Sequence, residues 1–132
     1  MLLETLVAFA IAAMALVVLY RGGIEGLNGT RTAERTEEAV ARARSRIDAL
    51  CHGARLAPGH ASGDDGSGFT WYSDTARAGG TLVNRGSADD PKPPLRAELF
   101  AVRVTVSWPG TIRPHQVALA TDCLAVTPLE GG

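Results

Sequence analysis

The first twenty residues form an almost continuous apolar run, in which Glu4 is the only charged side chain. Leu, Ala and Met dominate the run and favour a helix, and its apolar residues occur on every side of that helix. Residues 2–20 as one helix would be about 28 Å long, close to the hydrocarbon thickness of a bilayer. We therefore expect a membrane-spanning helix over residues 1–21. A removable secretory signal fits less well, because no basic residue precedes the run.

Residues 22–29 follow the apolar run and are rich in glycine. Gly22, Gly23, Gly26 and Gly29 lie within eight residues. Relative to alanines, they weaken a helix by roughly 3–4 kcal/mol. The segment is interpreted either as a flexible linker or as a helical hinge that melts and stretches.

An amphipathic helix is predicted over about residues 30–54. Its apolar or small residues recur at steps of three and four: Ala33, Thr36, Val40, Ala43, Ile47, Leu50 and Ala54. Charged residues fill the other faces, which we interpret as solvated, with Glu38 and Arg42 in the favourable i,i+4 order. Pro58-Gly59 is expected to stop the helix. Because the stripe is made of small residues, larger side chains must pack on Val40, Ala43, Ile47 and Leu50, from the same chain or a partner.

A β region is predicted over about residues 68–127. The segment 98–108 alternates cleanly, with Phe100, Val102, Val104, Val106 and Trp108 on one face. A turn at 109–114 returns the chain into a second strand over 115–126. Shorter strands are expected at 68–72 and 81–84, with loops at 61–68 and 86–94. The predicted fold is α+β, a long N-terminal helix packed on a small antiparallel sheet.

Composition and charge narrow the chemistry. The formal net charge is −1 and the sequence pI is about 6.3, which argues against nucleic-acid binding. The sequence lacks a nucleophile elbow, a phosphate-binding Gly-rich loop and the usual metal-ligand spacings. Asp64 and Asp65 are adjacent rather than alternating, so a solvated turn is favoured over a calcium site. We expect no enzyme activity, no catalytic residue, no cofactor and no metal.

The two cysteines, Cys51 and Cys123, lie at the end of the predicted helix and on the inner face of the last strand. In an oxidising compartment a bridge between them would stabilise the domain by about 4 kcal/mol in the chain-entropy model. The alternative is two buried thiols, and either role is structural.

Glu4 is the most informative residue of the apolar run. A carboxylate costs about 2.5 kcal/mol or more at mid-bilayer and less near the membrane edge. Glu4 therefore either lies among lipid headgroups or pairs with a cation in the membrane, most simply the N-terminal amine of another subunit. The second arrangement would fix the axial register between neighbouring helices.

The segment Leu2-Leu3-Glu4-Thr5-Leu6-Val7-Ala8-Phe9-Ala10-Ile11 resembles the N-terminal signature of type IV pilins and type II secretion pseudopilins. In that signature a basic leader is cleaved after Gly by a prepilin peptidase, an aromatic first residue is methylated, and the fifth mature residue is a glutamate. Glu4 matches this glutamate, which places Met1 on the second mature position. The leader, the cleavage Gly and the methylated aromatic residue are not in this sequence, so the resemblance assigns no processing site.

The rest of the chain is similar to I-type minor pseudopilins. The similarity rests on Ala41 to Arg46, Pro58-Gly59, Ser62-Gly63, the Phe69-Thr70-Trp71 strand and the Val104-Thr105-Val106-Ser107-Trp108 strand. It implies an anchor (1–21), a hinge (22–29) and a periplasmic domain (30–132) in the bacterial inner membrane. It also implies a place in the pseudopilus tip, which initiates filament assembly for export of folded proteins. The implied partners are J-type, K-type, H-type and major pseudopilins and the inner-membrane assembly platform.

Two other functions stay open on the sequence alone. One is a minor pilin of a type IV pilus, which would share the anchor and its glutamate. The other is a monomeric, membrane-tethered periplasmic binding module that uses Trp71, Tyr72 and Trp108 as a ligand face. The tryptophans lie at alternating core positions, which favours the core for both.

Overall fold

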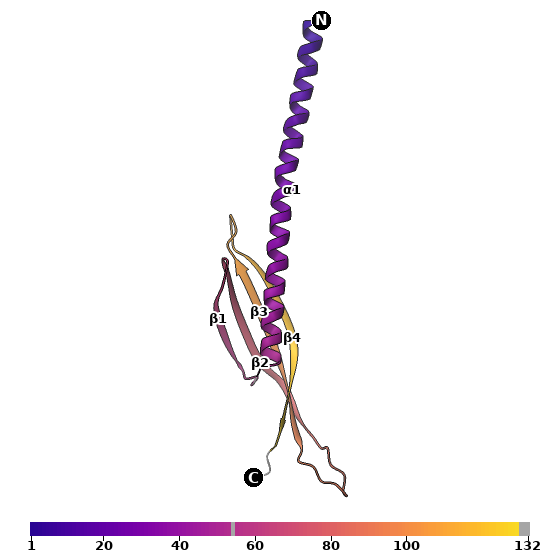
Figure 1. Cartoon of the computed structure of the whole chain (residues 1–132), viewed down its shortest axis with the longest axis vertical. Coiled ribbons are helices and arrows are strands. Elements are labelled where there is room, and N and C mark those ends of the chain that lie inside the picture. The colour runs from indigo at the N-terminus through magenta and orange to yellow at the C-terminus, as the bar shows by residue number, and fades with distance from the viewer. Residues whose placement is uncertain (54, 130–132) are drawn as a thin grey trace. The chain divides into compact units, whose positions relative to one another are not determined.

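The protein has one long N-terminal helix followed by an antiparallel sheet of four strands (Figure 1). The structure, a computed structural model, describes residues 1–53 and 55–129. Helix α1 spans Leu2–Cys51. The strands are β1 (Gly59–Gly66), β2 (Phe69–Val83), β3 (Leu95–Trp108) and β4 (His115–Pro128). The end of α1 packs on the sheet, which confirms the predicted α+β fold.

The chain divides into two compact units, one of residues 1–37 and one from Glu38 onward. The first unit is helical throughout its described length after Met1. The Gly-rich segment 22–29 lies inside this helix, so the flexible-linker interpretation does not describe the conformation seen here. A hinge that melts stays a prediction.

The second unit contains the hydrophobic core. Its sheet has the order β1-β2-β3-β4 and is antiparallel throughout, so each strand pairs with its neighbour in sequence. The predicted alternation of β3 is confirmed, because all five expected inward-facing residues from Phe100 to Trp108 are buried. Four of them, from Val102 to Trp108, pack with Phe69 of β2, Cys123 of β4 and the helix side chains of Ala39 and Ala43.

Three predicted boundaries were wrong within the sheet. The segment 61–68 was expected to be a loop, but most of it belongs to strand β1. The two short strands expected at 68–72 and 81–84 are parts of one strand, β2, and β3 begins at Leu95 rather than at residue 98. Residues 59–66 form strand β1 because they pair with β2, and the small residues of β1 leave room for a large side chain of β2. A Cβ added at Gly63 would lie 2.9 Å from Trp71 Nε1, so only glycine leaves room for the indole.

The helix also ends earlier than the sequence predicts. Its last residue is Cys51, whereas Pro58-Gly59 was expected to stop it, and the predicted last stripe residue, Ala54, lies outside the described residues. The His52 amide still bonds to the Asp48 carbonyl at 3.0 Å, and Gly53, a residue type common just beyond helices, follows. The disulfide of Cys51 to β4 holds the chain at this point, so the turn comes before the proline.

Candidate functional site

The apolar half of α1 is the first candidate site. Its large side chains are uncovered in the chain, as shown by exposed fractions of 86% for Leu2 and 77% for Phe9. This helix is long and apolar enough to span a membrane. An uncovered apolar surface of this length is stable only in lipid or against other protein.

Glu4 lies on the first turn of this helix. The neighbouring Thr5 hydroxyl donates to the backbone carbonyls of Leu2, at 3.0 Å, and Met1, at 3.2 Å. The hydroxyl is therefore satisfied inside the helix and adds little cost in lipid. Glu4, by contrast, makes no hydrogen bond or ion pair with any other described residue of the chain, so any cation that pairs with its carboxylate belongs to another molecule.

The Gly-rich segment 22–29 carries a second weakness that its glycine content alone does not reveal. The hydroxyls of Thr30 and Thr32 donate to the carbonyls of Gly26 and Asn28, at 3.1 and 3.0 Å. Such bonds compete for carbonyls that hold the helix together, and they tend to destabilise and bend it. A Cβ added at any of the four glycines would have nothing within 4 Å, so no packing requires them. Both features favour a segment of low helical stability.

Part of the predicted helix stripe lies on the sheet side of α1, whereas its first residue, Ala33, is exposed. Ala43 is fully buried, and Ile47 and Leu50 pack against the core. Val40 is half-buried. Ala39, which the stripe did not include, is fully buried beside Ala43. The two alanines let the helix approach the large side chains of β3, and this contact serves the core of the chain itself.

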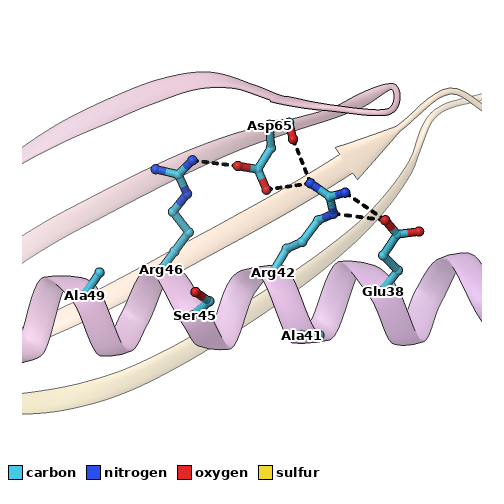
Figure 2. A pocket seen from close by; sticks show the side chains of 7 residues that line it. All are labelled: Glu38, Ala41, Arg42, Ser45, Arg46, Ala49 and Asp65. Carbon is cyan, nitrogen blue, oxygen red and sulfur yellow. Dashed lines mark hydrogen bonds and ion pairs between the residues drawn. The ribbon is translucent and has the colours of Figure 1, made fainter.

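A cluster of ion pairs joins the helix to the β1–β2 hairpin (Figure 2). Arg42 Nη1 lies 3.0 Å from Asp65 Oδ2, and Arg46 Nη2 lies 2.6 Å from Asp65 Oδ1. Arg42 also donates to the Asp65 backbone carbonyl, at 2.7 Å, and to Glu38 Oε1, at 2.7 Å. The predicted pair of Glu38 and Arg42 is confirmed, but the interpretation of all charged helix residues as a solvated face was wrong for Arg42 and Arg46.

Each arginine of the cluster also covers an aromatic ring. The guanidinium carbon of Arg42 lies 4.7 Å from the centroid of Phe69, and that of Arg46 lies 4.0 Å from Trp71. The planar group thus bonds to Asp65 through its edge and to the ring through its face, a combination that lysine cannot make. Both arginines are therefore fixed in position at the boundary of the core.

A β-bulge turns Asp65 toward the helix. Asp64 is opposite Thr70 and Gly66 is opposite Phe69, which leaves Asp65 as the extra residue of β1. The adjacent turn has positive φ at Ser67 (56°) and Gly68 (82°), the geometry of a tight two-residue hairpin. Asp64 Oδ1 accepts from the Gly66 amide at 2.7 Å and stabilises the bend. The two adjacent acids thus have different roles, which the expected solvated turn did not anticipate.

The cluster shifts two acid–base equilibria. Hydrogen bonds from Arg46 and then Arg42 hold the pKa of Asp65 below its usual value, against a smaller opposing effect of burial. Hydrogen bonds to Glu38 and Asp65 raise the pKa of Arg42. Two cations face two carboxylates here, so the cluster is close to neutral and is suited to clamping the hairpin onto the helix rather than to binding an ion.

The aromatic residues proposed as a ligand face do not share one. Trp108 is buried, with 7% of its surface exposed; it stacks with His115 and makes a tilted ring contact with Phe69. Trp71 is half-buried under Arg46 on the same inner face of the sheet. Tyr72 is on the opposite, outer face, beside His60. The tryptophans thus belong to the packing between helix and sheet.

Cys51 and Cys123 form a disulfide, one of the two alternatives that the sequence left open. Their Cα atoms are 5.4 Å apart, and Cys123 is buried. The bridge joins the last residue of α1 to the middle of β4. It therefore ties the helix to the sheet covalently at the end opposite the Arg42–Asp65 cluster.

The histidines lie apart. His52 Nδ1 is 3.0 Å from the Asp48 carbonyl, whereas His60 and His115 stack on Tyr72 and Trp108. Among the described residues, no group of three or more His, Cys, Asp or Glu side chains is placed to hold a metal ion.

Comparisons of the chain with protein-family models, curated proteins and solved structures found no match.

Proposed function

We propose that this chain is a structural subunit of a membrane-anchored filament, specifically an I-type minor pseudopilin of a type II secretion system. In this proposal α1 holds the chain in the bacterial inner membrane, and the sheet domain lies in the periplasm. The subunit joins J-type and K-type subunits in the filament tip and has no catalytic role. The observation that carries the proposal is an uncovered apolar helix with one carboxylate, Glu4, that has no partner in the described chain.

The physical argument starts from the cost of that carboxylate. An anchor that only tethers a domain gains nothing from a charge near its end, where lipid penalises it. A helix that packs beside copies or relatives gains an ion pair in a medium of low dielectric constant, where the attraction is strong. The pair is lost when neighbouring helices slip, so Glu4 would select one axial register.

The fold supports a structural role for the second unit. The helix end, the sheet, the Arg42–Asp65 cluster and the disulfide together make a closed small domain. The aromatic residues that a monomeric binding module would use are divided between two faces of the sheet. This division argues against that alternative. A minor pilin of a type IV pilus would use the same anchor and remains the second candidate.

A substitution at Glu4 tests the register role. We expect Glu4→Gln to leave the protein in the membrane with its disulfide formed, but to prevent filament incorporation and secretion of the substrate proteins. Glu34→Gln is the matched control, because it removes an exposed acid from the same helix beyond both the apolar run and the Gly-rich segment. Normal secretion by the Glu4→Gln variant would disprove the register role.

Co-purification distinguishes the two filament systems. The full chain in detergent is mixed with J-type and K-type minor pseudopilins, and sedimentation measures the stoichiometry. The proposal predicts a ternary complex at micromolar concentration. If none forms, and the chain instead joins the minor pilins of a type IV pilus, the assignment to type II secretion is wrong.

A further inference from the structure

The two edges of the sheet differ in ways that bear on binding. Strand β1 is short, contains three glycines and two acids, and is interrupted by the bulge at Asp65. These are the features by which sheets prevent further strands from pairing. Strand β4 has 14 residues, is paired through its whole length with β3, and has no break in register. Within β4, proline occurs only at the last position, Pro128, and lysine is absent.

The outer face of β4 is apolar near its end. Leu124 and Val126 are 64% and 50% exposed, and the neighbouring Leu99 of β3, directly opposite Leu124, is 37% exposed. Exposed branched side chains on adjacent strands would gain from burial, at about 25 cal/mol per Å² of covered apolar surface. Because the side chains of a strand alternate, a fifth strand beside β4 would place its own outer side chains next to Leu124 and Val126.

The outer face of β4 also carries one negative charge. Asp122 is the only carboxylate of β4, and its cross-strand neighbour on β3 is Ala101. No ion pair joins Asp122 to another described residue. An acid at the free edge, followed on the same face by two apolar residues, matches a strand with one basic and two apolar residues at alternating positions.

We propose that the free edge of β4 binds an extended segment of another protein as a fifth, antiparallel strand. The segment has alternating apolar residues opposite Leu124 and Val126 and a lysine or arginine opposite Asp122. Backbone hydrogen bonds to β4 supply affinity, and the alternating side chains supply specificity. This inference rests on the sheet alone and is independent of the proposed function in secretion.

A second copy of the chain fits this edge less well. Strand β4 contains no lysine or arginine, so a second copy of β4 paired with this edge would offer Asp122 no such cation. The occupant is therefore a strand from a different protein.

Peptide binding to the full chain in detergent tests the proposal. The probes are labelled twelve-residue peptides of alternating Val and Thr, in which one Lys moves stepwise along the sequence. A matched set carries Glu instead of Lys, and anisotropy measures affinity. We expect the best Lys peptide to bind about threefold or more tightly than its Glu counterpart. In the Asp122→Lys variant the preference should invert. Hydrogen exchange should slow at β4 and not at β1.

Two leucine variants provide a control for the apolar contact. Leu124→Lys should weaken the best peptide about tenfold, since it removes the covered side chain from the edge strand. Leu82→Lys changes a leucine that is similarly exposed, at 59%, but lies where β2 extends beyond its pairing with β1, on the side of the sheet away from β4, and it should change affinity less than about twofold. The proposal would be overturned if no peptide bound, or if the preference for Lys over Glu peptides stayed the same in the Asp122→Lys variant. It would also be overturned if hydrogen exchange slowed at β1. Self-association of the chain that Leu124→Lys abolishes would also overturn it, because the occupant would then be a second copy.

Discussion

Loss of the Cys51–Cys123 disulfide should lower the stability of this chain by about 4 kcal/mol. The bridge joins residues 72 apart in sequence and connects two elements that otherwise meet through side chains. In the chain-entropy model, closing a loop of this length constrains the unfolded state by about 4 kcal/mol. A domain of this size is stable by roughly 5–15 kcal/mol, so the bridge supplies a large part of the total.

Urea unfolding measures this contribution directly. Trp71 and Trp108 both lie between helix and sheet, and their fluorescence therefore reports on the contact that the bridge holds. With a urea dependence of about 2 kcal/mol per M, reduction should lower the midpoint by roughly 2 M. The Cys51→Ala/Cys123→Ala variant should unfold near the reduced midpoint and should not respond to reductant.

A small shift on reduction would refute this reasoning. A shift below about 0.5 M would correspond to about 1 kcal/mol, far less than loop closure predicts. In that case the unfolded chain would already be restricted, or the helix and sheet would be held mainly by packing and by the Arg42–Asp65 cluster. If the double alanine variant responded to reductant as the native chain does, the bridge could not be the origin of the shift.

Two further predictions concern the ion cluster and the hinge. The pKa of Asp65 is lowered in the folded chain, so its contribution to stability is complete above its usual value of 3.8 and is lost as pH falls through the lower folded value. Asp65→Asn should therefore reduce the free energy of unfolding at pH 7 and flatten its decline below about pH 4, whereas Asp74→Asn should leave the free energy of unfolding at pH 7 nearly unchanged in the same urea series. Replacing Gly22, Gly23, Gly26 and Gly29 by alanine should stabilise the helix by roughly 3–4 kcal/mol and slow its amide exchange. If the segment must melt in the filament, this variant should fold normally but assemble poorly, and normal assembly would exclude the hinge.

The sequence predicts best the elements with strong periodicity. Strand β3 alternates so regularly that its buried face follows from position alone, and the apolar helix follows from length and composition. The helix stripe predicts the contact of Ala43, Ile47 and Leu50 with the core, although it omits Ala39. In each case a local pattern and the tertiary packing favour the same conformation.

The sequence fails where tertiary contacts override local preference. Strand β1 has the composition of a loop, and only its pairing with β2 and the contact of Gly63 with Trp71 make it a strand. The early end of α1 depends on a disulfide to a residue far away in sequence. Neither contact leaves a local signal, because each depends on a partner strand whose position the segment itself does not determine.

The Arg42–Asp65–Arg46 cluster shows what kind of signal such a contact does leave. Two arginines four residues apart share one face of a helix, and that face adjoins the apolar stripe. Long guanidinium side chains at the border of a stripe reach past the helix, so they meet whatever packs beside it. An acid within a Gly-rich turn is the natural partner, but Asp64 and Asp65 are equivalent in the sequence. The bulge that selects Asp65 arises from the register of β1 on β2, and that register depends on the complete sheet.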